Sequence, residues 1–544
     1  MRNGSPNVPT PINEPVKSYA PGTPERAALK EKLTELLSQQ IEIPLIIGGE
    51  EVKTGDIGEC RCPHDHQHLL ATYHRAGEEH VEMAVAAAHE AWQEWSRMPW
   101  EARASVFLKA AQLLSGPWRM TLNAATMLGQ SKNPFQAEID SACELIDFWR
   151  FNPWYAQKIY EEQPPYSPTG MWNYVEQRPL EGFIFAVTPF NFTSIAGNLP
   201  TAPALMGNTV LWKPASSAVY PAYFLMKLLE AAGLPPGVIN LVAGSGAKIG
   251  DGILRHPEFA GVHFTGSTAT FQHMWEVIGK NIRGYHAYPR IVGETGGKDF
   301  VFAHPSADAE AVATALTRAA FEYQGQKCSA ASRAYIPKSL WPKLKEVFFA
   351  QLESIKMGDV TDFSNFMNAV IDRASYDKIV SYIDYAKKSG DAEIAFGGGY
   401  SDEKGYFIEP TVILTKDPRF KTMAEEIFGP VLTIFVYDDE KYEETLHLCD
   451  ETSPYALTGC IFADDRAAVN LAYDVLSHAA GNFYINDKPT AAVVGQQPFG
   501  GSRASGTNDK AGSPLNLLRW VTQRAIKETF DPPRDYRYPF MEQD

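Results

Sequence analysis

Residues 182–214 read GFIFAVTPFNFTSIAGNLPTAPALMGNTVLWKP, and this stretch decides the fold. Two short apolar segments, GFIFAV and TVLWKP, flank a stretch of helical character that runs to Met206. The pattern continues with a helix after Ser217 and with the apolar segments VINLVA (238–243) and GVHFTG (261–266), each followed by a further helix. Short buried strands that alternate with helices predict right-handed crossovers and a parallel sheet. We therefore expect a nucleotide-type α/β domain here.

A second alternation of strands and helices starts near Arg290. It comprises RIVGETGG, DFVFAH, a helix through Phe321, and then RAYIP, TVILT and VLTIFVY, which predict a second α/β domain. Toward the N-terminus, residues 24–40, 78–97 and 101–114 carry apolar residues at helical spacing. We expect this first region to be mainly helical and peripheral.

Two polar segments predict a small β arm. Residues 161–178 (EEQPPYSPTGMWNYVEQR) are too rich in proline for a core helix and too polar for a core strand. The segment LRWVTQRAIKETF, which starts near Leu517, alternates bulky and polar residues and is suited to be its partner strand. Because unpaired strand edges seek partners, we expect a homodimer or a higher homo-oligomer.

Composition excludes several classes of protein. The chain has 544 residues, 44% of them hydrophobic, which suggests about three domains with substantial cores. Its net charge of −16 disfavours nucleic acids and anionic membranes as partners. No segment reaches the roughly 18 apolar residues of a membrane span, and the six cysteines are scattered, as in a reducing compartment. We expect a cytoplasmic protein, or a mitochondrial matrix protein if the chain is a processed form.

Two turn motifs are candidate phosphate sites. GSGAKIG (244–250) lies between a strand and a helix, but its G-x-G-x-x-x-G spacing departs from the dinucleotide fingerprint, so a tight turn is the favoured interpretation. A phosphate contact at the helix N-terminus is the alternative, and it keeps Gly246 among the cofactor candidates. In HFTGST (263–268), Ser267 or Thr268 is expected to cap the next helix beside a pyrophosphate oxygen.

Cysteine and histidine alternate from Cys60 through RCPHDHQH (61–68), which raises the possibility of zinc. Structural zinc sites use C-x₂₋₄-C loops and H-x₃₋₅-H helices instead. We therefore favour a polar surface strand or loop and expect no metal.

The nucleophile candidate is Cys328, in FEYQGQKCSAASR (321–333). The stretch ends a helix, Gly325 permits a turn, and Lys327 stands beside a thiol among small residues. A nearby ammonium group or a helix N-terminus lowers the pKa of a thiol, as a nucleophile requires. The ordinary alternative is a small buried cysteine.

Three other segments favour the nucleophile. TPFNFTS (188–194) places Asn191 directly after a strand, and GETGGKDF (293–300) does the same for Glu294. EEIFGPV (425–431) contains Glu426 two residues before an aromatic side chain and a Gly-Pro turn. Together they supply an oxyanion donor, a general base and an acceptor for ribose hydroxyls.

These segments resemble the aldehyde dehydrogenase superfamily, and they occur in the order of that family. The likeness runs from about residue 40 to the C-terminus. Narrower phrases, such as AEIDSACELIDFWRFN (137–152) and SGTNDKAG (505–512), are similar to its 1-pyrroline-5-carboxylate dehydrogenase branch. The family motifs are FNF with Asn191, LWKP with Lys213, FTGS with Ser267, ETGGK with Glu294, GQKCSA with Cys328, EEIFGP with Glu426 and Phe428, and PFGGSRASG.

The resemblance implies an α/β, aldehyde dehydrogenase-like fold with three parts. These are N-terminal helices and an NAD-binding domain (1–160 and 181–292), a catalytic domain (293–515) and an oligomerisation arm (161–180 and 516–544). The implied reaction is the NAD-dependent oxidation of L-glutamate 5-semialdehyde to L-glutamate in proline degradation, through a cysteine thiohemiacetal and a thioester. NADP is expected to be tolerated, and a separate proline dehydrogenase is expected to supply the intermediate.

The resemblance also implies residue roles. Cys328 is the nucleophile, Glu294 the general base, and Asn191 shares the oxyanion with the Cys328 N–H. The substrate residues are Glu144 toward the amino group, Phe192 and Phe499 around the stem, Lys327 and Ser329 beside the nucleophile, and Thr490, Ala491 and Ala492 in the loop 490–493 toward the carboxylate. The cofactor residues are Thr188, Pro189, Phe190, Lys213, Ser216, Gly246, Thr265, Gly266, Ser267, Glu426 and Phe428.

The sequence departs from the family pattern in two places, the loop with Ala491 and Ala492 and the position of Ser216. Ala491 and Ala492 replace a Gly followed by Ser or Ala, which keeps the N–H donors, removes one hydroxyl and leaves Ala491 strained if the loop requires a positive φ. Ser216 stands where many relatives carry a glutamate for the adenosine ribose, so charge does not exclude a 2′-phosphate.

Two alternative functions remain. One is an aldehyde dehydrogenase for another carboxylate-bearing semialdehyde, such as succinate semialdehyde. The other is a catalytically inactive structural protein, which the presence of Cys328, Glu294 and Asn191 disfavours.

Overall fold

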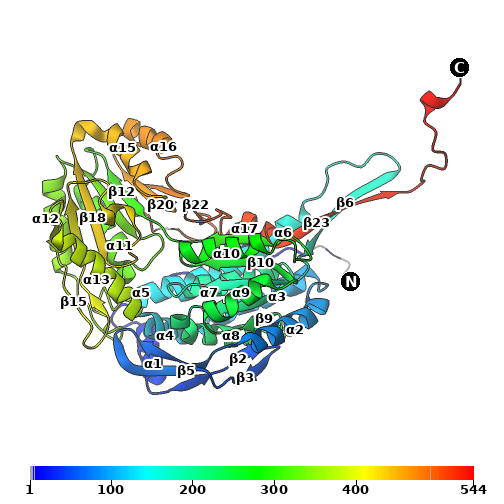
Figure 1. Cartoon of the computed structure of the whole chain (residues 1–544), viewed down its shortest axis with the longest axis horizontal. Coiled ribbons are helices and arrows are strands. Elements are labelled where there is room, and N and C mark those ends of the chain that lie inside the picture. Colours follow the sequence, from blue (N-terminus) through cyan, green and yellow to red (C-terminus); the bar gives the residue numbers. More distant parts are fainter. Residues whose placement is uncertain (1–3, 5, 491, 544) are drawn as a thin grey trace.

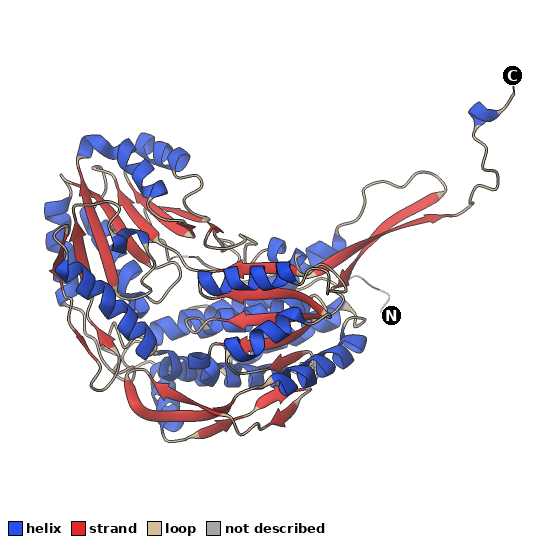
Figure 2. Cartoon of the chain, viewed as in Figure 1, coloured by secondary structure: helices blue, strands red, loops and turns tan. Residues whose placement is uncertain are grey.

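The computed structural model describes residue 4, residues 6–490 and residues 492–543. Two seven-stranded sheets form the two halves of the molecule, and a two-stranded arm projects away from the body (Figures 1 and 2). No helix among these described residues combines the length and apolar character that crossing a bilayer requires.

The first sheet has the order β11-β10-β7-β8-β9-β2-β3. Its five strands from β11 to β9 are parallel, as the alternation of strands and helices predicts. The two strands at the far edge, β2 and β3, are antiparallel additions from the N-terminal region. The bounds are β2 Leu45–Ile47, β3 Glu50–Val52, β7 Phe183–Thr188, β8 Thr209–Pro214, β9 Ile239–Leu241, β10 Phe259–Thr265 and β11 Arg290–Glu294.

Both faces of this sheet are buried under helices. Phe183 and Phe185 of β7 pack into one core, while Ile184 and Ala186 pack into the other, because successive side chains on a strand point to opposite faces. The first core includes α1 Pro24–Leu37, α2 Glu78–Trp95, α4 Arg119–Gln130, α9 Gly246–Arg255 and α10 Thr268–Lys280. The second includes α3 Trp100–Ser115, α6 Leu145–Glu161, α7 Thr193–Leu205 and α8 Val219–Ala232.

The second sheet has the order β14-β17-β18-β13-β12-β20-β21 and is parallel except for β14 at its edge. Its strands are β12 Asp299–Ala303, β13 Ala331–Pro337, β14 Ala392–Phe396, β17 Thr411–Thr415, β18 Val431–Tyr437, β20 Thr458–Phe462 and β21 Asn482–Ile485. Helices α13 Arg373–Lys388, α15 Tyr442–Glu451 and α16 Arg466–Val475 share the core on one face, and α11 Ala309–Phe321 and α12 Trp341–Glu353 share the core on the other. The predicted second α/β domain is confirmed.

The predicted arm is confirmed as a pair of strands. β6 (Met171–Pro179) and β23 (Val521–Thr529) run antiparallel over nine residue pairs. They form the ribbon at the upper right of Figure 1. Trp172 on β6 is 53% exposed, so the ribbon presents an aromatic side chain to its surroundings.

Two predictions about segments need correction. Residues Arg290–Glu294 do not begin the second sheet; they are β11, the edge strand of the first sheet, paired with β10. The N-terminal region is not peripheral, because β2 joins the first sheet and α3 and α6 pack against it. In each case the local apolar pattern identified the element correctly but carries no information about its long-range partner.

The segment from Cys60 to His68 is not a polar surface strand. It forms a hairpin of β4 (Ile57–Cys62) and β5 (Asp65–His74), next to β1 (Ile41–Ile43), with Cys60, Cys62 and His64 buried. Its turn contacts the second half of the molecule, where the His66 N–H donates to the Lys404 carbonyl at 2.9 Å. No group of three or more metal-ligating side chains occurs among the described residues.

Candidate active site

The topology of the first sheet creates a binding crevice. The chain builds β7, β8 and β9 outward in one direction and then returns to place β10 and β11 on the other side of β7. Ligands of open parallel sheets bind outside the carboxyl ends of the strands at such a reversal. Thr188 and Thr265 end the two strands that flank the reversal, and Glu294 is paired with Thr265. A candidate base therefore stands beside the expected crevice.

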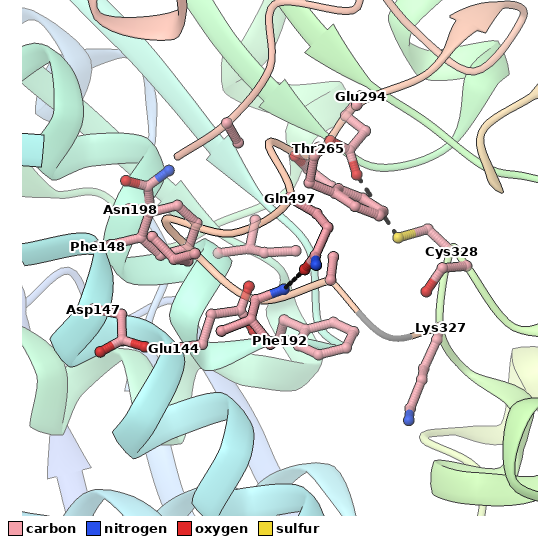
Figure 3. Close-up of a pocket in the computed structure, with 18 of the residues that line it drawn as sticks. Glu144, Asp147, Phe148, Phe192, Asn198, Thr265, Glu294, Lys327, Cys328 and Gln497 are labelled. Carbon is pink, nitrogen blue, oxygen red and sulfur yellow. Dashed lines mark hydrogen bonds between the residues drawn. The ribbon is translucent and has the colours of Figure 1, made fainter. Parts of the chain in front are cut away.

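A cavity of about 500 Å³ lies at this place (Figure 3). It is large enough for a small metabolite, and aromatic and aliphatic side chains make most of its wall. The lining comes from the start of α6, the start of α7, the ends of β10 and β11, the loop around Cys328, the loops from Lys488 to Gly501 and from Asn508 to Ala511, and the N-terminal residues Asn13, Glu14 and Val16. Distant segments thus meet around one space.

A strained turn presents Cys328. After α11 the backbone adopts positive φ at Tyr323 (52°), Gln324 (55°) and Gly325 (66°), which side chains normally disfavour. The Gln324 amide stabilises the turn by donating to the carbonyls of Ser131 and Ala369 at 3.0 and 2.8 Å. A Cβ on Gly325 would stand 2.3 Å from the carbonyl oxygen of Gly429, so glycine is required there. The predicted turn before the nucleophile is confirmed.

Cys328 and Glu294 face each other in the cavity. The Cys328 thiol Sγ lies 3.7 Å from Glu294 Oε1 and donates to it (Figure 3). Burial raises the pKa of Glu294 to about 7, only partly opposed by the Cys328 hydrogen bond and by Lys510. Burial and the carboxylates around it, Glu294 foremost, raise the pKa of Cys328 well above its usual value. The thiol is therefore protonated at rest, beside a base that can accept its proton.

The proposed effect of Lys327 on the thiol is wrong. Its Nζ pairs with Glu322 Oε2 at 3.0 Å, and Figure 3 shows its side chain pointing away from the Cys328 sulfur. Adjacent positions in an extended turn direct their side chains to different sides, which the sequence alone does not reveal. Lys327 lines the cavity as a cation but does not activate the nucleophile.

Asn191 contacts the backbone of the loop that carries the nucleophile. Its Nδ2 donates to the Gln326 carbonyl at 3.0 Å, two residues before Cys328, and the side chain is buried. The next helix, α7, is anchored by Asp140, which accepts the N–H groups of Thr193 and Ser194 at 3.0 and 2.8 Å. A carboxylate at a helix N-terminus satisfies its free donors and favours its dipole. This anchor fixes where Asn191 and the following Phe192 can lie.

Most substrate candidates line the same cavity. Ala491 lies outside the described residues. The Thr490 hydroxyl is buried with no hydrogen-bond partner among the described residues, so it can donate a hydrogen bond to a ligand. The lining candidates are Glu144, Phe192, Lys327, Ser329, Thr490, Ala492 and Phe499.

Basic and acidic side chains line different sides of the cavity. Arg318, Lys327 and Lys488 stand near one another on one side with Glu322, and burial lowers the pKa of Lys488. On another side, burial and the neighbouring Asp140 raise the pKa of Glu144 to about 8. A ligand with separate anionic and cationic groups is suited to this arrangement.

The π-helical segment η1 (Glu138–Glu144) carries the acidic side of the cavity. It lies between α5 (Pro134–Ala137) and α6, and its Asp140 accepts a bond from Lys132 Nζ at 2.6 Å. Single π-helical turns inside α-helices occur frequently at functional sites. Here the wider turn places the anchor of α7 and the cavity acid Glu144 on one short segment.

The cofactor candidates gather at the carboxyl edge of the first sheet. The Lys213 side chain passes over Gly246, where an added Cβ would stand 3.5 Å from Lys213 Cε. Gly246 begins α9, a helix whose first N–H groups can receive a diphosphate, and Ser267 caps α10 by accepting from the Thr270 N–H at 3.3 Å. The other candidates on these strand ends are Thr188, Pro189, Phe190, Ser216, Thr265 and Gly266, of which Thr265 also lines the cavity.

Glu426 and Phe428 reach this edge from the second half of the molecule. Glu426 Oε1 accepts the Gly297 N–H at 3.1 Å, and burial raises the pKa of Glu426. A Cβ on Gly296 would stand 2.1 Å from the same carboxylate, and one on Gly297 would stand 2.6 Å from the Cys328 carbonyl oxygen, so both glycines of ETGGK lie where a side chain would clash. Phe428 has a φ of 64° and packs edge-on against Phe190, with ring centroids 5.8 Å apart. The two halves therefore meet at the predicted ribose and nicotinamide residues.

Several lining residues were missed from the sequence. Asp147 lies one turn after Glu144, so the i, i+3 spacing of two acids on a helix was a usable signal. Gln497 shapes the substrate loop by accepting the Val493 N–H at 3.0 Å. Asn13 and Glu14 had no signal at all, because an irregular N-terminal segment shows no periodicity.

Comparison with known proteins agrees with this geometry. Residues 52–526 match the aldehyde dehydrogenase family. A delta-1-pyrroline-5-carboxylate dehydrogenase, labelled mitochondrial, of Dictyostelium discoideum is 54% identical over 537 residues, which are 98% of this chain and 96% of the relative. The delta-pyrroline-5-carboxylate dehydrogenase of Mycobacterium tuberculosis, crystallised with NAD, has a TM-score of 0.96 and 54% identity over 100% of both chains. Proline utilization A of Bdellovibrio bacteriovorus has a TM-score of 0.91 and 28% identity over 96% of this chain and 54% of that chain.

Proposed function

The chain belongs to the aldehyde dehydrogenase family, and from this premise we propose that it oxidises L-glutamate 5-semialdehyde, the open form of 1-pyrroline-5-carboxylate, to L-glutamate with NAD. The observation that carries the proposal is the Cys328 thiol 3.7 Å from Glu294 in a cavity with a cationic side and an acidic side. An amino acid aldehyde has both charges that these sides recognise.

The chemistry follows from the pair. Glu294 takes the thiol proton, and the Cys328 sulfur attacks the aldehyde carbon, so that a C–S bond forms and the carbonyl electron pair moves to oxygen. The Asn191 amide and the Cys328 N–H are the donors for this oxyanion. After loss of hydride the carbonyl reforms as a thioester. Once the thiol proton has passed from Glu294 to solvent, the free carboxylate removes a proton from water, which attacks the thioester. The C–S bond breaks, the Cys328 sulfur keeps its electron pair and takes the proton back from Glu294, and the acid is released.

NAD, when bound, supplies the acceptor for the hydride and its electron pair. The residues suited to hold it are Lys213 and Glu426 for ribose hydroxyls, the α9 N-terminus and Ser267 for the diphosphate, and Phe428 beside the nicotinamide end. The donor set fits this group: N–H groups at a helix start, a buried cation and a half-buried carboxylate lie along one sheet edge. Ser216 is exposed at this edge and adds no negative charge that would exclude NADP.

Recognition of the substrate is assigned to the two sides of the cavity. The carboxylate meets Ser329, the Thr490 hydroxyl and the loop that follows, with Lys327 and Lys488 adding positive charge. The ammonium group lies toward Glu144, and its approach favours the ionised form of that carboxyl. Phe192 and Phe499 hold the aliphatic stem, since rigid aromatic rings lose little entropy on binding.

A substrate panel on the purified protein tests the function. We expect NADH absorbance to rise with 1-pyrroline-5-carboxylate and NAD, with a kcat/KM at least about 100-fold above that for propanal, because propanal offers neither charge. A slower rate is expected with NADP. Strong turnover of propanal or succinate semialdehyde without turnover of 1-pyrroline-5-carboxylate would reject the substrate assignment.

The variant Glu144→Gln tests recognition of the substrate amino group separately from recognition of its carboxylate. We expect it to raise KM for 1-pyrroline-5-carboxylate about 10- to 30-fold, because a charged pair with the substrate ammonium is lost. Succinate semialdehyde has the carboxylate but no amino group, so it is the matched control, and its KM should change less than about two-fold. Equal changes with both substrates would remove Glu144 from amino-group recognition.

The arm and the pathway partner complete the proposal. We propose that β6 and β23 mediate a homodimer or a higher homo-oligomer, a role supported by their projection from the body and their exposed aromatic side chain.

We also propose that a separate proline dehydrogenase supplies the substrate. The catalytic and cofactor motifs, spread from Asn191 to Phe428, all serve one aldehyde-oxidising site.

A further inference from the structure

The N-terminal segment of the protein runs along the outside of the acidic cavity wall. This segment, residues 6–19, has no helix or strand, yet it contacts α4, η1 and α6, and we call it the strap. The Val8 N–H donates to Gln157 Oε1 at 2.6 Å, and the Lys17 N–H donates to Glu138 Oε1 at 2.9 Å. The Tyr19 hydroxyl donates to Glu138 Oε2 at 2.7 Å. Side chains of the helices thus satisfy the irregular backbone along its length.

Asn13 is the point where the strap touches the substrate cavity. Its Nδ2 donates to Asp147 Oδ2 and to the Val494 carbonyl, both at 2.8 Å. Its Oδ1 accepts from Gln496 Nε2 at 3.0 Å. All four residues line the cavity. One side chain therefore connects Asp147, near the start of α6, to the loop that follows Thr490.

The two structures that Asn13 joins hold opposite ends of the proposed substrate. Asp147 stands one turn after Glu144 on the side assigned to the ammonium group, and Val494 continues the loop assigned to the carboxylate. The next strap residue reinforces this junction, because the Glu14 N–H donates to Asp147 Oδ1 at 2.7 Å. The Gln496 N–H bonds to the Val493 carbonyl at 3.0 Å, so the loop half held by Asn13 connects directly to the substrate-binding half.

We propose that Asn13 is a positioning residue that sets the distance between the ammonium side and the carboxylate loop, and so determines selectivity for a substrate with both groups. The proposal rests on the proposed function. Asn13 suits this role because an amide both donates and accepts, whereas aspartate cannot donate to Asp147 and a hydroxyl cannot make two donor bonds. Ligand affinity depends strongly on such preorganisation of the binding loop.

The test compares KM and kcat of the full-length protein for 1-pyrroline-5-carboxylate and for propanal. Asn13→Ala should raise KM for 1-pyrroline-5-carboxylate about ten-fold, as expected for the loss of one or two net hydrogen bonds. Its kcat, and both constants for propanal, should stay within about two-fold, because Cys328 and Glu294 are untouched. Asn7→Ala is the matched control, since Asn7 Oδ1 accepts from Gln157 Nε2 at 2.8 Å and neither residue lines the cavity.

An exchanged pair gives a second, independent readout. Asn13→Asp places two carboxylates together and should raise KM at least as much as alanine. The double variant Asn13→Asp/Asp147→Asn restores the bond between positions 13 and 147 with the donor and acceptor exchanged, but not the bond to the Val494 carbonyl. Its KM should therefore fall at least about three-fold below that of Asn13→Asp without reaching the wild-type value. It also carries the test if Asn13→Ala does not fold, and propanal turnover shows that each variant is folded.

An unchanged KM in Asn13→Ala would overturn the proposal, as would an equal rise for propanal or for Asn7→Ala. Absence of rescue in the double variant would do the same. Wild-type protein that oxidised succinate semialdehyde instead of 1-pyrroline-5-carboxylate would reject the proposed function. Since succinate semialdehyde has the carboxylate alone, an unchanged KM for it in Asn13→Ala would then reject the positioning of the loop as well.

Discussion

Replacing Cys328 with alanine should lower kcat for 1-pyrroline-5-carboxylate by at least about 10⁴-fold, because the thiol forms the covalent bond on which both halves of the reaction depend. The change removes one buried atom group and leaves Glu294, Asn191 and the cofactor edge in place. NADH formation at saturating substrate measures the loss. Binding of NAD, followed by protein fluorescence, should stay within about two-fold.

A second thiol in the same cavity is the matched control. Cys143 also lines the space, but its Sγ contacts Arg119 Nη2 at 3.6 Å and the Pro15 carbonyl at 3.9 Å instead of the candidate base. Cys143→Ser should retain kcat within about three-fold. Activity of Cys328→Ala above about 1% of the wild type would mean that another group carries the chemistry.

Glu294→Gln should slow the reaction about 10³-fold at a different step. Glutamine keeps the shape but cannot take a proton from water, so hydrolysis of the thioester becomes limiting. Acylation also loses its proton acceptor, but we expect it to slow less than hydrolysis. Burial still raises the pKa of the Cys328 thiol, yet glutamine removes the further rise that the Glu294 carboxylate causes, so more of the thiol ionises without a base. We expect a burst of one NADH per site followed by slow turnover, and mass spectrometry of the quenched protein should detect the acyl adduct on Cys328.

The pH dependence of kcat, compared between the wild type and Glu294→Gln, tests the assignment of Glu294 as the general base. Because burial raises the pKa of Glu294 to about 7, kcat of the wild type should rise with pH through about 7, and this rise should disappear in Glu294→Gln.

The contribution of Glu294 to the stability of the fold should change with pH in the opposite direction. A carboxyl whose pKa is higher in the folded state stabilises the fold at low pH and loses this contribution as pH rises through about 7. The variant should therefore melt higher than the wild type at pH 8 but not at pH 4; absence of a burst together with an unchanged pH profile would assign the base elsewhere.

Local patterns predicted the elements of this fold well. The period of apolar residues identified the strands from Phe183 to Thr265 and the paired arm, because buried strands and turn glycines leave direct marks in sequence. The catalytic residues were found for a related reason. A nucleophile, a base and an amide need particular side chains at strand ends and turns, and their order along the chain is distinctive.

What the sequence did not predict depends on long-range geometry. The strand ending at Glu294 joined the first sheet, Lys327 turned toward Glu322, and Cys60 and Cys62 became buried under neighbouring helices. Each outcome is decided by a partner far away in the chain. The contact of Asn13 with Val494 spans 481 positions, and no periodicity of either segment encodes it.

The arm has a consequence for the order in which the chain is made. Pro179 of β6 pairs with Val521 of β23, so β6 leaves the ribosome about 340 residues before its partner exists. At typical rates of synthesis this interval is roughly 20 to 70 s. During that time β6 offers an unpaired strand edge with Trp172 exposed, which is the kind of surface that aggregates. Its polar residues, among them Asn173, Glu176 and Arg178, limit the apolar surface that the unpaired strand exposes during this time. The synthesis of β23 thus ends the period in which β6 lacks its partner.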